Sequence, residues 1–162
     1  MPNSTTHSTT HSSAPIGNRP LSIFEEIFPG DTNAYGTIFG GRILALMDRA
    51  AGLVASRFAH CHFITASIDT IKFRAPVKLG ETLEVEARVI YTSHRTCAVK
   101  VMVYAIEMTL WDRRPCCEGT LFMVGIGADG KPTAIPTLTP VTDEDKRLWD
   151  EAKSLHDRML GK

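Results

Sequence analysis

The sequence predicts an α+β domain in which one long helix is covered by a largely antiparallel sheet. Residues 40–59 have the apolar periodicity and the Ala, Leu and Met content of a helix. The four segments that follow alternate apolar and polar residues with the two-residue period of strands. A strand, a long helix and then a run of strands is the element order of an α+β domain, and the sheet must curl around the helix to cover it.

Length and charge limit the classes of function. The chain has 162 residues, about one domain, and its 18 basic and 18 acidic side chains give a formal net charge of zero. A neutral chain has no overall field with which to gather nucleic acid or an anionic membrane surface. No apolar run approaches the ~20 residues that span a bilayer. We therefore expect neither nucleic acid nor a membrane as a partner.

The cysteines indicate a reducing compartment. Cys61, Cys97, Cys116 and Cys117 include no C-x-x-C pair, and adjacent cysteines rarely bridge each other without strain. The amino terminus also lacks the apolar core of a secretory signal. We therefore expect reduced thiols in the cytoplasm.

Composition divides the chain into three parts. Residues 1–19 are mostly Ser, Thr, His, Pro and Gly, have almost nothing to bury and are expected to be a disordered tail. Residues 20–136 form the predicted domain, and residues 137–162 form a linker with an amphipathic helix. Within the domain, residues 21–28 are expected as a first strand, and residues 29–33 have the composition of a turn.

The long helix and the later strands are placed by their patterns. The helix over 40–59 is apolar around most of its circumference, so we expect it to be buried on more than one side. Strands are predicted over 63–76, 82–92, 95–111 and 116–127. The segment 95–111 is apolar on both faces, as expected of a central strand. The segment 82–92 alternates most clearly, with one face formed by Leu83, Val85, Ala87, Val89 and Tyr91.

The carboxyl-terminal segment 143–160 predicts an amphipathic helix. Thr142 or Asp143 is the expected amino-terminal cap, and Gly161 stands just past the expected end. The apolar seam that should face the domain consists of Leu148, Ala152, Leu155 and Met159.

One carboxylate in the long helix is out of pattern. On a helical projection a polar stripe contains Arg42, Arg49, Ser56 and Arg57, whereas Asp48 falls among small and apolar residues. A carboxylate on such a face is costly unless it is paired, hydrogen-bonded or open to a cleft. Partial removal from water also suits a general base near neutral pH. The alternatives are an ion pair with Arg49, Arg57 or another chain, or a helix that is less buried than its sequence indicates.

The start of the same helix is open. Gly40 and Gly41 leave backbone N–H groups free at the positive end of the helix dipole. Without side chains they let a carbonyl oxygen approach closely, as in an oxyanion hole, or they serve only a tight loop-to-helix junction. Gly41 and Asp48 lie roughly 10 Å apart along the helix axis. If both act on one carbonyl carbon, they come from different subunits.

A longer motif includes these residues. The segment Asp31 to Gly41, DTNAYGTIFGG, followed by Leu46-Met47-Asp48, closely resembles the signature of the acyl-CoA thioesterases of the hotdog superfamily. That family includes bacterial broad-range enzymes and brain-type cytosolic acyl-CoA hydrolases. The resemblance covers residues 21–136 and continues through His60, Thr65, Phe73, the Ala75-Pro76-Val77 turn and Gly80-Glu81.

The resemblance implies a hotdog fold, in which a long central helix is wrapped by an antiparallel sheet. It also implies hydrolysis of acyl-CoA to a carboxylic acid and coenzyme A, with no metal and no cofactor. Asp48 would activate water or attack the thioester itself, Asn33 would position the water or the carbonyl, and the amide of Gly41 would hold the oxyanion. Asn33 and Asp48 would come from opposite protomers of a dimer or a trimer of dimers.

The same resemblance suggests how coenzyme A binds. The turn over residues 92–96, TSHRT, is similar to the segment that relatives place near the nucleotide phosphates, which makes Ser93 and Arg95 candidate binding residues. Thr65 is a candidate pocket residue. The alternatives are a solvated basic turn and a strand threonine that faces a neighbour. Departures from the family at Thr37 and Arg42 affect no residue assigned to chemistry.

Other functions are less well supported by the residues. His60-Cys61-His62 lacks further ligands at the spacing of a metal site, and no G-x-S-x-G elbow marks a serine hydrolase. A hotdog dehydratase or hydratase usually pairs a histidine with an acid on the helix or its entry loop, and neither segment carries a histidine here. A non-catalytic acyl-CoA sensor stays open, although the presence of both Asn33 and Asp48 makes catalysis the simpler account.

Overall fold

The computed structural model describes residues 19–161, so the expected tail lies outside the described residues except for Arg19. None of the helices within 19–161 combines the length and the hydropathy needed to cross a membrane. The elements follow the predicted order and are β1 (Leu21–Glu26), a 3-10 turn (Pro29–Asp31), α1 (Gly40–Ala59), β2 (His62–Phe73), β3 (Thr82–Thr92), β4 (Thr96–Glu107), β5 (Asp112–Ile126) and α2 (Asp143–Met159).

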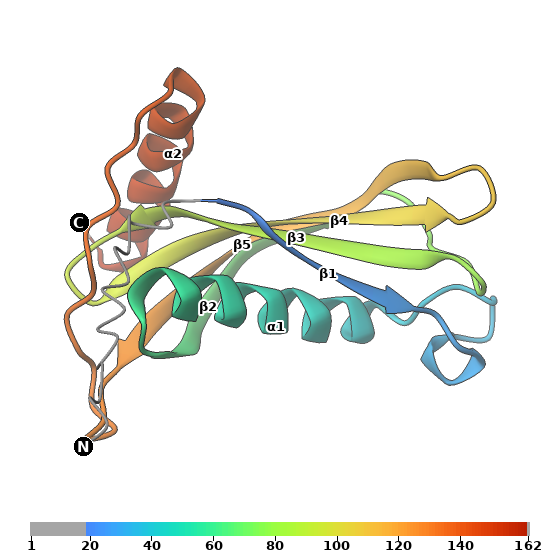
Figure 1. Cartoon of the computed structure of the whole chain (residues 1–162), viewed down its shortest axis with the longest axis horizontal. Helices are drawn as coiled ribbons and strands as arrows, with labels where there is room; N and C mark the ends of the chain where they lie inside the picture. Colours follow the sequence, from blue (N-terminus) through green and yellow to red (C-terminus); the bar gives the residue numbers. More distant parts are fainter. Residues whose placement is uncertain (1–18, 162) are drawn as a thin grey trace, which may run out of the picture.

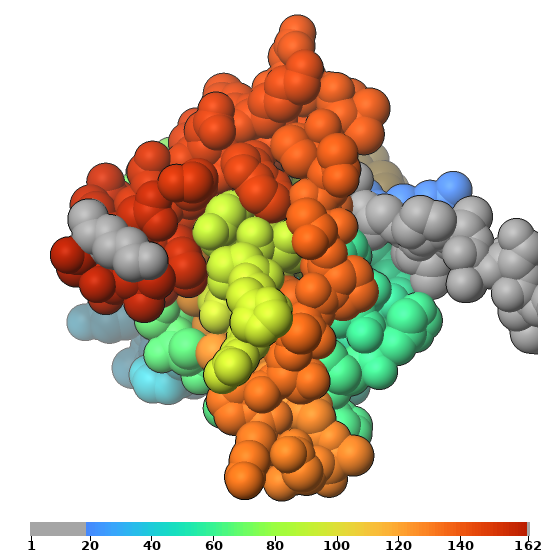
Figure 2. Space-filling view, turned by 90° about the vertical axis from the view of Figure 1, so that its left-hand side faces the viewer, coloured from blue at the N-terminus to red at the C-terminus, as the bar shows by residue number. Residues whose placement is uncertain are grey.

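The strands form one antiparallel sheet in the order β1-β3-β4-β5-β2. Hairpins join β3, β4 and β5, and β4 is central, as its apolar sequence predicts. The sheet lies between the helices, with α1 along one face and α2 over one end of the other (Figure 1). Figure 2 looks onto that end and shows α2 in red beside the yellow-green turn between β3 and β4. This arrangement confirms the predicted α+β fold.

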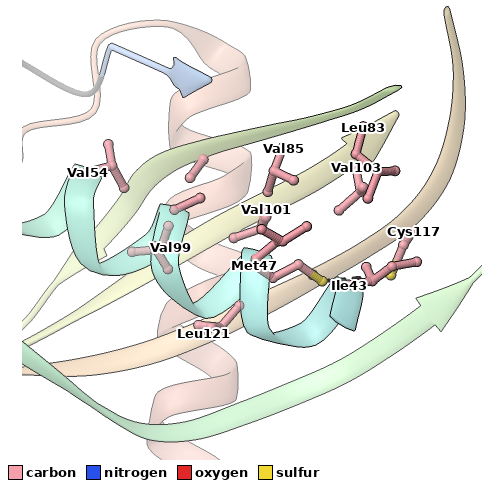
Figure 3. Close-up of a cluster of buried hydrophobic side chains, with 14 of the residues drawn as sticks. Ile43, Met47, Val54, Leu83, Val85, Val99, Val101, Val103, Cys117 and Leu121 are labelled. Atoms are coloured by element: carbon pink, nitrogen blue, oxygen red, sulfur yellow. Dashed lines mark hydrogen bonds between the residues drawn. The ribbon is translucent and has the colours of Figure 1, made fainter. Parts of the chain in front are cut away.

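One side of α1 packs against the sheet. Its side chains meet Val85, Val99, Val101 and Leu121 in a single apolar cluster (Figure 3). Burial of each large apolar side chain contributes about 1.5–3 kcal/mol, and the alanines let the helix backbone approach the strands closely. The buried residues of α1 are Ile43, Leu46, Met47, Ala50, Ala51, Val54 and Ala55.

The opposite side of α1 faces outward, so the expectation that this helix is buried on more than one side is wrong for the single chain. Ala45, Asp48, Arg49 and Leu53 are all exposed. The sheet covers only the side of the helix that is turned toward it. No element within residues 19–161 supplies a second covering layer.

α2 packs on the other face of the sheet. Leu148, Ala152 and His156 are its buried residues. The His156 ring lies 5.4 Å from the Tyr91 ring and 6.0 Å from the Phe122 ring, measured between centroids. This second, smaller cluster fixes α2 to one end of the sheet.

The predicted seam of α2 is wrong at its last position. Met159 is 44% exposed, and His156 is buried instead, because the four-residue spacing from Leu148 through Ala152 continues to residue 156. Thr142 is the cap, as expected: its hydroxyl accepts a hydrogen bond from the Asp145 N–H at 3.0 Å.

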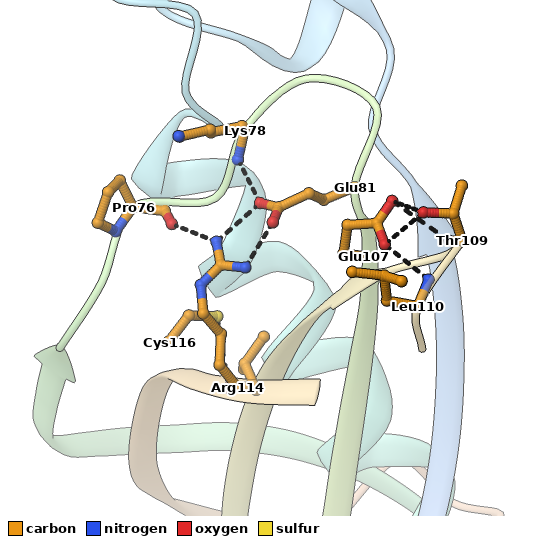
Figure 4. A network of polar contacts seen from close by, with 9 residues as sticks. Pro76, Lys78, Glu81, Glu107, Thr109, Leu110, Arg114 and Cys116 are labelled. Atoms are coloured by element: carbon orange, nitrogen blue, oxygen red, sulfur yellow. Dashed lines mark hydrogen bonds and ion pairs between the residues drawn. The ribbon is translucent and has the colours of Figure 1, made fainter. Parts of the chain in front are cut away.

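Two local irregularities change what the strand patterns predict. A β-bulge between Val89 and Tyr91 puts Tyr91 on the α2 face while Val89 stays on the α1 face, so the expectation that both face the same way is wrong. β4 ends at Glu107 rather than Trp111. The Glu107 carboxylate accepts a hydrogen bond from the Leu110 N–H at 2.8 Å and closes a turn there (Figure 4).

Candidate active site

The carboxylate of Asp48 lies on the outward side of α1 and is held by one neighbour. The hydroxyl of Thr65 on β2 donates a hydrogen bond to Asp48 Oδ1. Asp48 forms no ion pair with a basic group in residues 19–161. The alternative of an ion pair with Arg49 or Arg57 is therefore wrong, and the alternative of a helix less buried than its sequence indicates is confirmed. The acid stays open to approach from outside the chain.

Asp48 and Thr65 border a hollow between α1, β2 and β5 of about 490 Å³. The side chain of Met123 on β5 lies beneath it and is 2% exposed. Thr65 on β2 and Met123 on β5 are paired across the two strands, which brings the Thr65 hydroxyl close to the Met123 side chain at the bottom of the hollow. The other lining residues are Arg49, Gly52, Leu53, Ser56, His62, Phe63 and Ile64.

The first turn of α1 has no side-chain cap. Phe39 is the N-cap residue, and within residues 19–161 the amides of Gly40 and Gly41 have no hydrogen-bond acceptor. The Phe39 ring lies over Gly41 so closely that a Cβ at residue 41 would be 2.6 Å from Phe39 Cε1. These two N–H groups at the positive end of the helix dipole can bind a polarised carbonyl oxygen.

Asn33 organises the loop that leads into α1. Its Oδ1 accepts hydrogen bonds from the Tyr35 N–H at 2.9 Å and the Thr37 N–H at 3.3 Å, and its Nδ2 donates to the Thr37 hydroxyl at 2.9 Å. This is the turn-forming role of a loop asparagine. The Phe39 N–H donates to the Asp31 carbonyl at 2.8 Å and ties the loop to the helix. These bonds hold Asn33 beside the amino-terminal end of α1, where the residue is exposed.

The turn between β3 and β4 carries both candidates for binding coenzyme A. The Ser93 N–H donates to the Thr96 carbonyl at 2.7 Å, and the Gly125 N–H on β5 donates to the Arg95 carbonyl at 2.9 Å. Arg95 is exposed, and its guanidinium forms no ion pair within the described part of the chain. Because Gly125 pairs with Phe63 near the start of β2, the turn stands near the carboxyl-terminal end of α1 (Figure 2).

The structure brings only some of the candidate residues together. Asp48 and Thr65 are in contact, whereas Asn33 and Gly41 lie at one end of α1 and the turn over residues 92–96 lies near the other. α1 has 20 residues and so spans about 30 Å. Within residues 19–161 no hydrogen bond joins Asn33 to Asp48. A single chain therefore contains the parts of the candidate site but not their assembly.

The sequence is similar to that of known thioester hydrolases. The family described as the thioesterase superfamily matches residues 35–111. An uncharacterized acyl-CoA thioester hydrolase of Zymomonas mobilis is 30% identical over 139 residues, which are 86% of this chain and 89% of that protein. The crystal structure of a hexameric acyl-CoA thioesterase is 34% identical with a TM-score of 0.80 and covers 86% of this chain and 89% of its own. The chain belongs to the hotdog-fold acyl-CoA thioesterases.

Two further members extend the comparison. The rat cytosolic acyl coenzyme A thioester hydrolase is 29% identical over 87% of this chain, but the match spans only 38% of the rat protein. The acyl-CoA hydrolase of Staphylococcus aureus, solved with butyryl coenzyme A, coenzyme A and coenzyme A disulfide, is 28% identical with a TM-score of 0.80 over 88% of this chain and 87% of its own. Further structures of that enzyme have alanine in place of an aspartate, a threonine or an asparagine.

The cysteines of this thioesterase-family chain are not poised as nucleophiles. Burial raises the pKa of Cys97 and of Cys116 to about 12 and that of Cys117 to about 11. Burial also raises the pKa of Cys61. All four thiols are therefore protonated near neutral pH, whereas a reactive cysteine is a thiolate. Within residues 19–161 no group of three or more His, Cys, Asp or Glu side chains is placed to hold a metal ion.

Sequence reasoning missed three residues of the candidate site. Gly52 follows Asp48 by one helical turn, and this four-residue spacing could have indicated that the two residues lie on the same face of the helix. Met123 comes from β5, and no sequence pattern relates it to α1. Thr37 was singled out only as a departure from the family, yet its hydroxyl and N–H hold the side chain of Asn33.

Proposed function

We propose that this chain hydrolyses acyl-CoA to a free carboxylic acid and coenzyme A at an active site that two chains form together. One observation carries the proposal: the Asp48 carboxylate, held by the Thr65 hydroxyl, borders an open hollow and has no ion pair within residues 19–161. An acid in this setting can take a proton from water. The relatives and solved structures that are named acyl-CoA hydrolases supply the substrate class.

The geometry of α1 supports an active site shared between chains. Gly41 and Asp48 lie on one continuous helix, about 10 Å apart along its axis. One thioester carbonyl group cannot contact both in the same chain. In the proposed site Asn33 and Gly41 therefore belong to one chain, and Asp48 and Thr65 belong to the other.

The edge strand β2 offers the surface for this association. Only β5 pairs with it among the described strands, so the backbone groups along its other side are available to a second strand. Large apolar side chains are exposed on β2, on α1 and at the residue that caps α1, namely Ile64, Ile68, Phe73, Leu53 and Phe39. We expect two chains to pair as a dimer through β2. Three such dimers would give a hexamer like that of the solved neighbour.

In the proposed reaction Asp48 is a general base. Its carboxylate takes a proton from a water molecule, and the water oxygen bonds to the thioester carbonyl carbon. The N–H of the partner's Gly41 donates a hydrogen bond to the oxyanion as it forms, and the partner's Asn33 positions the water or the carbonyl. The C–S bond then breaks, and the thiolate of coenzyme A receives the proton from Asp48. No metal or cofactor takes part in these steps.

Nucleophilic attack is the alternative chemistry for the same residues. The Asp48 carboxylate would then bond to the carbonyl carbon and expel the thiolate of coenzyme A. The resulting anhydride would be hydrolysed by water in a second step. Both routes give the same products and require the same open carboxylate.

The replaced residues of the staphylococcal enzyme support these assignments. Its replaced aspartate stands 15 residues after its replaced asparagine and 17 residues before its replaced threonine. Asp48 stands at the same two separations from Asn33 and Thr65. We therefore assign the reaction to these three side chains, with Thr65 orienting the carboxylate rather than binding coenzyme A.

The turn over residues 92–96 is the proposed contact for the phosphates of coenzyme A. The exposed guanidinium of Arg95 can form a bidentate pair with a phosphate. The hydroxyl of Ser93 donates a long hydrogen bond to the Thr96 carbonyl at 3.4 Å and can exchange it for a phosphate oxygen. We place the chain in the cytoplasm, in agreement with the naming of the rat relative as cytosolic.

Thiol release from acyl-CoAs by two variants, alone and mixed, tests the proposal. Asn33→Ala chains and Asp48→Asn chains should each release little thiol. When the two are co-expressed, half of the dimers contain one chain of each kind, and one of their two sites keeps both side chains intact. The mixture should then regain ~25% of the wild-type activity, as two-fold symmetry dictates.

Two results would contradict the proposal. If native mass spectrometry shows mixed dimers but thiol release does not return, the site is not shared in this way. If wild-type protein binds acyl-CoA and releases no thiol at all, the chain is an acyl-CoA sensor rather than a hydrolase.

A further inference from the structure

We propose that Gly52 determines which acyl chains this protein accepts. The inference rests on the proposed function and assigns the acyl chain of the substrate to the hollow beside Asp48. Gly52 lies one helical turn after Asp48 and lines this hollow with Met123 and Thr65. Because glycine has no side chain, residue 52 would leave room for the acyl chain, and Met123 would form the floor beneath that chain.

Packing within residues 19–161 of one chain does not require glycine at residue 52. A Cβ there would meet only Met123 Cε, at 3.8 Å, which is ordinary contact. Gly119 differs, because a Cβ at that residue would be 2.3 Å from Ile71 Cδ1. Glycine inside a helix is also less stable than alanine. A glycine in the interior of α1 that packing within the chain does not require therefore indicates a use for the empty space.

The hollow runs from Asp48 toward the end of α1 near the turn over residues 92–96, so the pantetheine arm is the competing occupant. The chemistry of the lining favours the acyl chain. The pantetheine arm carries amide groups, which need hydrogen-bond partners when they leave water. The most buried side chain of the hollow is Met123, and Phe63 beside it is half-buried. Arg49 and His62 are exposed. A hydrocarbon chain suits this apolar floor and needs no polar partner there.

The hollow also has a limited length. Along β2 it extends from Thr65, next to the reactive carboxylate, to His62. Those positions lie roughly 10 Å apart at the rise of a strand. A longer acyl chain that followed β2 would pass the end of the hollow at His62 and Ser56 and enter solvent. We therefore expect activity to rise with chain length while the chain stays within the hollow and to rise no further beyond it.

The test measures kcat/KM from acetyl-CoA to palmitoyl-CoA for wild type, Gly52→Ala and Gly52→Leu. The leucine side chain introduced by Gly52→Leu should fill the space above Met123, so kcat/KM should fall about fourfold for each methylene group that loses its place. The Gly52→Ala variant should shift the preference slightly in the same direction. Acetyl-CoA is the internal control, because its methyl group ends close to the carboxylate.

A second change distinguishes loss of space from loss of folding. Met123→Ala on the Gly52→Leu background should restore part of the activity on longer chains, because it lowers the floor beneath the new side chain. Thermal melting and native mass spectrometry verify that each variant folds and associates. Recovery specific to longer chains cannot come from a general defect.

The outcomes separate this inference from the proposed function. If Gly52→Leu raises KM equally for acetyl-CoA and for longer substrates, the pantetheine arm occupies the hollow and the inference is overturned. An unchanged profile in Gly52→Leu would place the acyl chain elsewhere. If wild-type protein releases no thiol from any substrate, the proposed function itself fails, and the inference fails with it.

Discussion

Glu81 and Asp48 are two carboxylates in opposite situations. Glu81, in the loop before β3, accepts hydrogen bonds from both terminal nitrogens of Arg114 and from the Lys78 N–H at 2.7 Å (Figure 4). The Arg114 guanidinium holds the pKa of Glu81 below its usual range. Asp48 has one neutral donor, the Thr65 hydroxyl, and faces outward. The first carboxylate is satisfied within one chain, and the second is not.

In the proposed function this difference separates a structural acid, Glu81, from a reactive one, Asp48. Arg114 also donates to the Pro76 carbonyl at 3.1 Å and so fastens the loop before β3 onto β5. A cation as close to Asp48 as Arg114 is to Glu81 would stabilise the charged form of Asp48 and make it a weaker base. Two of the three arginines of α1 are directed elsewhere: Arg42 pairs with Asp31 at 3.2 Å, and Arg57 donates to a backbone carbonyl. Arg49 borders the same hollow as Asp48 but forms no ion pair with it within residues 19–161.

The largest effect is expected when the reactive acid is neutralised. Asp48→Asn keeps the shape of the side chain and an acceptor for the Thr65 hydroxyl but cannot take a proton. We expect kcat for acyl-CoA hydrolysis to fall by about 10²–10⁴-fold, the usual contribution of a general base. The unfolding free energy should change by less than about 1 kcal/mol, because the residue is exposed. Turnover within tenfold of wild type would contradict the assignment.

Neutralising the structural acid should have the opposite signature. Glu81→Gln weakens the contact with Arg114, so we expect a loss of about 1–2 kcal/mol in urea unfolding at pH 7, with turnover per folded chain unchanged. The matched control is Glu151→Gln on α2, whose pair with Arg147 is more than half exposed on both sides. That pair should contribute close to nothing. Equal losses in the two variants would show that the Glu81 contact is no stronger than a surface pair.

The contact between Glu81 and Arg114 should make the free energy of unfolding depend on pH. The folded-state pKa of Glu81 is depressed below 4.5, so its stabilisation is fully present above that pH and is lost as pH falls through the folded-state value. Urea unfolding from pH 7 to pH 3 should show the penalty of Glu81→Gln shrinking at the acid end. A penalty that is constant with pH would mean that the ionised form of Glu81 adds no stability.

Removing the donor beside the reactive acid should have a smaller effect on turnover. Thr65→Val keeps the volume of the side chain but leaves the Asp48 carboxylate without its hydrogen bond, so we expect kcat to fall about tenfold while KM stays the same. Thr65→Ser restores a hydroxyl and should recover most of the rate. If the serine variant is no better than valine, the threonine acts through packing rather than through its hydroxyl.

Much of the fold was predictable because periodicity reports which side chains meet a core. The limits of α1 match the predicted 40–59, and the clear alternation of 82–92 matches β3. The failures have local causes. A bulge after Val89 reverses the side of Tyr91, and an alternating pattern cannot show where a bulge falls. The one-sided burial of α1 was missed because an apolar sequence does not show whether a side chain is covered by its own chain or by a second chain.

The candidate site was predictable only in part. Asp48 was found because a carboxylate among small residues breaks the pattern of a helix. Thr65 was expected as a pocket residue or as a strand threonine that faces a neighbour. Its contact with Asp48 was not predictable, because the contact depends on how β2 lies beside α1. Met123 was missed for the same reason, since it reaches the hollow from the far end of the domain's sequence.

The smallest effect is expected far from both acids, at the turn over residues 92–96. Arg95→Ala should raise KM for acyl-CoA about fivefold with kcat unchanged, because a phosphate contact binds substrate and transition state equally. Arg95→Lys keeps the charge but loses the planar guanidinium, so its KM should lie between the values for wild type and Arg95→Ala. With acyl-pantetheine, which lacks the nucleotide, wild type and Arg95→Ala should have the same KM. A KM difference that persists with acyl-pantetheine would mean that Arg95 acts on the rest of the substrate and not on its phosphates.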